Sequence, residues 1–89
     1  MTLREVVLDS LADDIETIVQ IMEYLNYLGV QYTKEQLIEE LDLLYLGGYI
    51  EIVYPKEVNI STLRNFEVIE DLWFDMTESG RQEWGIINN

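Results

Sequence analysis

Apolar residues recur every three or four positions in the first half of the chain, a period typical of amphipathic helices. We expect a first helix over residues 3–12, because Thr2 and Glu5 stand at the spacing of a capping box, in which each side chain satisfies a backbone N–H of the other residue. Asp13 and Glu16 repeat that spacing and predict the start of a second helix. Apolar residues cover more than half of its circumference, so this second helix should be the central one.

The third helix has the clearest boundaries. Gly29 fits the left-handed residue that ends the second helix. Thr33 and Gln36 then form a new capping box, and the pair Gly47 and Gly48 predicts where the third helix ends. Its inward stripe should consist of Leu37, Ile38, Leu41, Leu44 and Tyr45. We expect one core that contains Ile18, Met22, Leu37, Leu41, Leu44 and Phe74.

Two segments in the second half favour β-strands. Residues 49–54 are rich in β-branched and aromatic side chains, and they are followed by Pro55, which cannot donate a ladder hydrogen bond. Residues 72–76 alternate between two faces, as a strand requires. The two strands should pair as an antiparallel ribbon, although the connecting segment 55–70 is too long for a tight hairpin. Thr77 can cap a short terminal helix.

The composition restricts both the class of protein and its chemistry. The 89 residues, 48% of them apolar, support one domain over residues 1–89 with a single core. The chain has no His and no Cys, which excludes catalytic Ser/His and Cys/His pairs, Cys/His zinc sites and disulfides. We therefore expect no enzyme activity, no catalytic residues, no cofactor and no metal site.

The remaining polar groups have ordinary structural interpretations. Asp13, Asp14 and Glu16 lack the alternate-position spacing of a calcium loop, and helix capping explains them. Trp73 and Trp84 are expected to pack against apolar neighbours, with each indole N–H directed at an acceptor.

The charge of the chain is strongly negative in both halves. Five Lys and Arg against 18 Asp and Glu give a formal net charge of −13. Such a surface repels nucleic acids and anionic membranes, because affinity for both depends on basic groups. No apolar run approaches the roughly 18 residues of a membrane span, and Glu5 and Asp9 lie where a signal peptide would be basic and then apolar. We expect a cytoplasmic protein.

The order of elements and two short motifs resemble a known regulator fold. The third helix is followed by a Gly-Tyr-Ile strand start at residues 48–50, and the second strand closes in Met-Thr-Glu-Ser-Gly-Arg at residues 76–81. This arrangement resembles the winged-helix domains of MarR- and PadR-type bacterial regulators. The resemblance implies an α+β fold: a three-helix core, a two-stranded antiparallel wing and a short C-terminal helix. In that fold, Gly80 would let the terminal helix lie close to the wing strand.

Three features depart from the pattern of those regulators. Only Asp13 and Asp14 separate the first two predicted helices, so the short strand often found there is not expected. The third helix, which enters the major groove in DNA-binding winged helices, carries one base, Lys34, against four acids. The wing segment is acidic as well, despite Lys56 and Arg64. Charge therefore opposes the DNA binding that the resemblance implies.

The outward face of the third helix is the candidate partner site. At about 100° per residue, Gln36, Glu39, Leu43 and Leu46 share one strip that faces away from the inward stripe. Either the two leucines pack beneath segment 55–70 or the terminal helix, or they are left for a protein contact with a basic or apolar partner.

Three functions remain open, in order of preference. The first is a non-enzymatic, acidic winged-helix domain that binds protein, as a homodimer or with a regulatory partner. The second is a DNA-binding transcriptional regulator. The third is a DNA mimic, whose acidic surface occupies a nucleic-acid-binding protein.

Overall fold

The chain forms a mixed α+β fold in a computed structural model that describes residues 2–56, 58, 62–63 and 67–87. Within these residues the elements are α1 (Leu3–Ser10), β1 (Glu16–Thr17), α2 (Ile18–Tyr27), α3 (Lys34–Leu46), β2 (Ile50–Tyr54), the 3-10 turn η2 (Ile69–Asp71), β3 (Trp73–Met76) and α4 (Glu78–Ile87). The predicted three helices, two strands and terminal helix are all present, and α1 is two residues shorter than expected.

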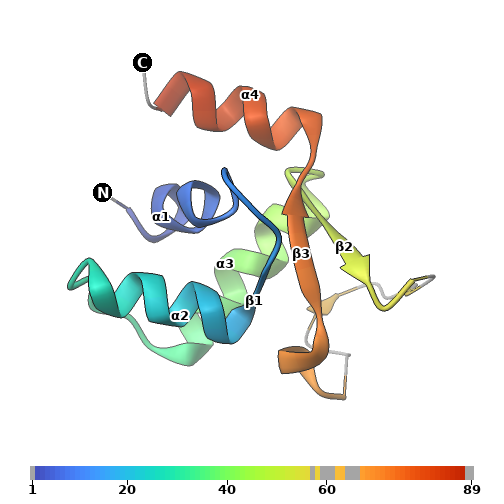
Figure 1. Cartoon of the computed structure of the whole chain (residues 1–89), viewed down its shortest axis with the longest axis horizontal. Helices are drawn as coiled ribbons and strands as arrows, with labels where there is room; N and C mark the ends of the chain where they lie inside the picture. The colour runs from blue at the N-terminus through green and yellow to red at the C-terminus, as the bar shows by residue number, and fades with distance from the viewer. Residues whose placement is uncertain (1, 57, 59–61, 64–66, 88–89) are drawn as a thin grey trace.

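The sheet has three antiparallel strands in the described part of the chain, in the order β1-β3-β2. Figure 1 shows β3 between its two neighbours, with α1, α2 and α3 on one side of the sheet and α4 across its end. Phe74 on β3 lies opposite Glu16 of β1 and Ile52 of β2. The expectation of a two-stranded sheet without a strand between the first two helices was therefore wrong.

The start of α2 also differs from the prediction, for a related reason. Thr17, not Asp13, caps the helix: its hydroxyl accepts from the Gln20 N–H at 3.3 Å, and the Gln20 side chain accepts from the Thr17 N–H at 2.9 Å. Asp14 instead accepts from the N–H of Ile15. Residues 16 and 17 pair with β3, so the helix can begin only after them.

The boundaries of α3 confirm the prediction. The Thr33 hydroxyl accepts from the Gln36 N–H at 3.1 Å, and the Gln36 side chain accepts from the Thr33 N–H at 2.9 Å. Gly47 is the C-cap residue, and Gly48 has a φ of 79°, a left-handed value that few other residues adopt without strain. Gly29 ends the α2 segment in the same way, with a φ of 73°.

The core contains the predicted residues and two that the periodicity did not identify. Ile18, Leu37, Leu41, Leu44 and Phe74 are fully buried, and Met22 packs against them while partly exposed. Leu63 and Ile69, from the segment between β2 and β3, are buried as well. These two described residues of the segment therefore contribute to the core.

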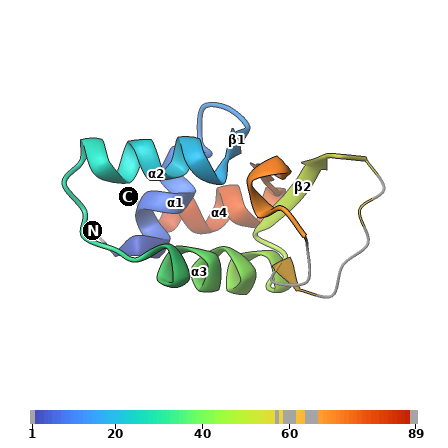
Figure 2. The same cartoon turned by 90° about the horizontal axis from the view of Figure 1, so that it is seen from below.

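The central helix is α1 and not α2. Val6, Val7 and Leu8 are fully buried, and α1 contacts α2, α3 and α4. Figure 2 shows α1 between α2 and α3, and Figure 1 shows α4 on the other side of α1. The apolar stripe of α2 is narrower than expected, since Val19 and Leu28 are exposed to solvent.

The contact between α4 and the start of β2 depends on Gly80. A Cβ at this position would lie 2.0 Å from the carbonyl oxygen of Tyr49, so a side chain cannot be placed there without moving the backbone. Thr77 accepts from the Gly80 N–H at 3.1 Å, as a capping residue does. The expectation of a close approach at Gly80 is confirmed.

Candidate protein-interaction surface

Gln36, Glu39, Leu43 and Leu46, which we call the outer strip, lie along the solvent side of α3. In Figure 2, α3 runs along one edge of the molecule. Leu43 is 56% exposed and Leu46 is 60% exposed, and Gln36 and Glu39 are exposed too. Neither leucine is buried beneath the β2–β3 segment or α4, which was the alternative interpretation of these residues.

An open groove of about 330 Å³ runs beside the outer strip, on the side of α3 that faces the start of α1. It is lined by Leu3, Gln31, Gln36, Glu39, Glu40 and Leu43. Three residues of the outer strip therefore share one concave surface, whereas Leu46 lies beyond it. Leu3 and Gln31 come from other segments, and helical periodicity could not place them beside α3 because their approach depends on tertiary packing.

The groove is acidic, and its carboxylates are not neutralised within the described residues. Glu39 and Glu40 make no hydrogen bond or ion pair with any described side chain. Lys34, the one base of α3, pairs with Glu70. Around the axis of α3, Lys34 lies about 120° or more from Glu40 and Glu39, so it does not face the carboxylates of the groove. The negative field of the groove is therefore available to a partner.

On the opposite flank of α3, polar side chains form hydrogen bonds within the chain itself. Asp42 accepts from the Thr62 hydroxyl at 2.6 Å and from the Leu63 N–H at 2.7 Å. These bonds hold the β2–β3 segment against the helix. The hydrogen bond from Lys34 lowers the pKa of the Glu70 carboxyl below its ordinary value, and a backbone hydrogen bond acts in the same direction.

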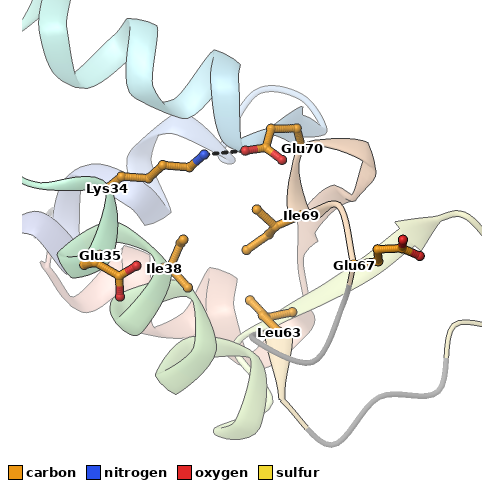
Figure 3. A pocket seen from close by; sticks show the side chains of 7 residues that line it. All are labelled: Lys34, Glu35, Ile38, Leu63, Glu67, Ile69 and Glu70. Carbon is orange, nitrogen blue, oxygen red and sulfur yellow. Dashed lines mark hydrogen bonds and ion pairs between the residues drawn. The ribbon is translucent and has the colours of Figure 1, made fainter.

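A second pocket, of about 440 Å³, lies on this flank. Figure 3 shows Ile38, Leu63 and Ile69 directed toward the same space, with Lys34 and Glu70 meeting across one side and Glu67 directed away. Residues 64–66, which adjoin this pocket in sequence, lie outside the described residues. We therefore assign no ligand to it.

A third pocket, whose lining includes Asp9, Glu16 and Tyr24, contains hydrogen bonds that join helices. Asp9 of α1 accepts from the Tyr24 hydroxyl at 2.5 Å and from the Trp84 indole N–H at 3.2 Å, so one carboxylate joins α1, α2 and α4. The hydrogen bond to Asp9 raises the pKa of the Tyr24 hydroxyl, which keeps it a donor. The predicted acceptor for the Trp84 indole is confirmed. Burial, with Asp14 and Glu23 nearby, raises the pKa of Glu16 in the same region.

Most of the described bases are engaged within the chain. The Arg4 guanidinium lies 4.8 Å from the centre of the Tyr49 ring, a cation–π contact. Arg81 donates to the carbonyl of Ala12 at 3.4 Å and lies 3.9 Å from Asp75. Lys56 is exposed, and Arg64 lies outside the described residues. Few cations are left to contact phosphate.

Across residues 2–56, 58, 62–63 and 67–87, no group of three or more acidic residues is arranged to hold a metal ion. In the same residues, no helix has the length and apolar character that crossing a membrane requires. Asp13, Asp14 and Glu16 thus form no such group.

Comparison with known proteins finds no protein-family model, no curated protein and no solved structure that matches this chain.

Proposed function

We propose that this chain is a winged-helix domain that binds another protein through the outer strip of α3. The winged-helix part is supported by the order helix, short strand, helix, helix, strand, strand, and by the strand order β1-β3-β2. In this assignment β2 and β3 form the wing, and α3 occupies the position of the helix that reads DNA in regulators of this fold.

The observation that carries the interaction part is the pair of exposed leucines on an acidic helix. Leu43 and Leu46 lie one turn apart and are each more than half exposed. Single exposed leucines are ordinary, but two adjacent ones beside a groove are more typical of a contact surface. Leu3 supplies further apolar surface to that groove.

DNA binding is the competing function, and it follows only from the resemblance. Affinity for a duplex depends on Lys and Arg that displace counterions from phosphate. Here the α3 helix has one base, Lys34, which is paired with Glu70. We expect no duplex to bind appreciably near physiological salt. Sub-micromolar affinity for any duplex in a salt-controlled titration would place the DNA-binding function first.

Photo-cross-linking in cells of the source organism tests the protein-interaction function. A photoreactive amino acid at position 46 should yield a cross-link to protein, either another chain or a second copy. The same group at position 86 on α4 is the control, because Ile86 is 72% exposed but lies far along the chain from the outer strip. Cross-links to nucleic acid alone, or equal protein yields at both positions, would contradict the proposal. Sedimentation then separates the homodimer from a regulatory partner.

A further inference from the structure

The geometry points to a specific occupant: we propose that the outer strip and its groove receive a basic amphipathic helix from a partner protein. This inference rests on the proposed protein-interaction function and specifies its partner. It combines the apolar surface of Leu3, Leu43 and Leu46 with the unneutralised carboxylates of Glu39 and Glu40.

A second copy of this chain fits the surface poorly. Each copy carries a net charge of −13, and a symmetric contact through the outer strip would bring the Glu39 and Glu40 carboxylates of both copies together. Like charges facing each other across an interface oppose association. Lys34 and Arg81, which could offset them, are already paired with Glu70 and Asp75. A partner with Lys and Arg at its rim satisfies the same carboxylates.

The outer strip has the length of a helix-docking surface, and its apolar part is Leu43 and Leu46. From Gln36 to Leu46 the strip extends roughly 15 Å, the length of about ten helical residues. Leu43 and Leu46 are neighbours on one helix face, so they form a ridge against which a partner's apolar i, i+3 and i+4 positions can pack. An amphipathic helix lying on a groove in this way is a recurring mode of peptide recognition.

The carboxylates flank that ridge in a way that favours bases beside the apolar stripe of the partner. On α3, Glu39 stands about 40° to one side of Leu43, and Glu40 stands about 60° to the other side. Lys or Arg residues next to the partner's leucines would therefore approach one carboxylate each. Both carboxylates are accessible to solvent. They should therefore raise the association rate and its dependence on salt more than they raise the affinity.

The test uses synthetic peptides and the full chain. The probe is a labelled peptide of about 14 residues, long enough to span the strip as a helix, with leucines at helical spacing and lysines beside them. Two controls match it: the same residues in scrambled order, and the same sequence with glutamates for lysines. Fluorescence anisotropy should give a micromolar Kd for the probe at low salt, and a weaker one near 0.15 M salt, with neither control binding comparably.

Variants locate the binding to the outer strip. Leu43→Ser should weaken binding about tenfold, as truncation of a central apolar anchor does. Ile86→Ser, which removes an even more exposed apolar side chain from α4, should leave the Kd unchanged. The double change Glu39→Gln and Glu40→Gln should flatten the salt dependence, whereas Glu78→Gln should not.

A labelled wild-type chain supplies an independent readout that does not depend on any variant folding. NMR shift changes on adding the probe should centre on the amides of Leu3, Gln31 and Leu43. Absent binding, equal binding of the scrambled peptide, or shift changes centred on α4 would each overturn the basic-helix proposal. A protein cross-link at position 46 together with such a result would leave the protein-interaction function standing and change only the class of partner.

Discussion

The two sides of α3 differ in how the rest of the chain uses them. On the covered side, Leu41 is fully buried, Ile38 contacts the core, and Asp42 holds Thr62 and Leu63 of the β2–β3 segment. On the other side, the outer strip presents its two leucines to solvent. On the covered side of α3, apolar groups are buried and Asp42 is hydrogen-bonded by the chain. On the outer strip, the leucines remain exposed and Glu39 has no partner among the described residues.

That difference separates structural residues from candidate functional ones within a single element. Leu41 stabilises the fold because its whole side chain is removed from water, whereas Leu43 remains 56% exposed and contributes less. Asp42 on the covered side has donors from the chain, whereas Glu39 and Glu40 have none among the described residues. Substitutions on the two sides should consequently change different measured quantities: stability on one side, association on the other.

The largest expected difference is between two leucines two positions apart. Leu41→Ala removes a fully buried side chain and should lower the free energy of unfolding by about 2 to 5 kcal/mol. Leu43→Ala should change it by less than about 0.5 kcal/mol, because that side chain is 56% exposed. Urea unfolding of both variants measures the difference. Equal losses would mean that the two sides of α3 are not distinct.

The next effect concerns the acids of the two sides. Asp42→Ala removes the acceptor of two part-buried hydrogen bonds and should cost about 1 to 2 kcal/mol. The matched variant Glu39→Ala should have almost no effect on stability. Amide hydrogen exchange gives a local check, since the Leu63 N–H loses its acceptor only in the Asp42 variant and should exchange faster. Unchanged protection of Leu63 would show that Asp42 does not hold the segment.

Local signals explain which parts of the fold were predictable. The ends of α3 follow from Thr33 with Gln36 and from Gly47 with Gly48, which act within a few residues of each other. The stripe of α3 also separated Leu41 from Leu43 correctly, because helical periodicity alone decides which face a side chain occupies.

Tertiary contacts explain what the sequence did not reveal. The Asp13–Glu16 and Thr17–Gln20 spacings both fit a capping box, and the pairing of Glu16 and Thr17 with β3 selects the second. A two-residue strand has no periodicity of its own, so it was missed. Leu63 and Ile69 showed only as apolar residues in a polar segment, and Leu3 gave no sign that it lines the groove beside Leu43.

Adding charge to the outer strip should barely alter stability while removing association. In the double variant Leu43→Lys and Leu46→Lys, each lysine follows an acid at the favourable i, i+4 spacing, after Glu39 and Asp42 respectively. The last turn of α3 has no base, so a cation there also complements the helix dipole. The melting temperature should stay the same or rise slightly, and the basic peptide should no longer bind. A stable double variant that still associates normally would remove this face from consideration.

The smallest effect is a pH dependence on the covered side, at the pair of Lys34 and Glu70. The hydrogen bond from Lys34 holds the pKa of Glu70 below its ordinary 4.5 in the folded state. A depressed carboxyl pKa contributes stability that is present above the unfolded value and is lost as the pH falls through the folded value. Both side chains are partly exposed, at 50% and 37%, so the contribution should stay below about 1 kcal/mol.

Lys34→Met should therefore raise the pKa of Glu70 toward its ordinary value, as measured by NMR titration of the carboxyl carbon. The variant should be slightly less stable than the natural chain near pH 6, and this difference should disappear as the pH falls through the lowered pKa that Glu70 has in the folded chain. Lys56→Met removes an exposed lysine without a described partner, and it should leave the pKa of Glu70 unchanged. If both variants shift that pKa equally, the cause is the general loss of positive charge. The ion pair would then not distinguish the covered side of α3 from its outer strip.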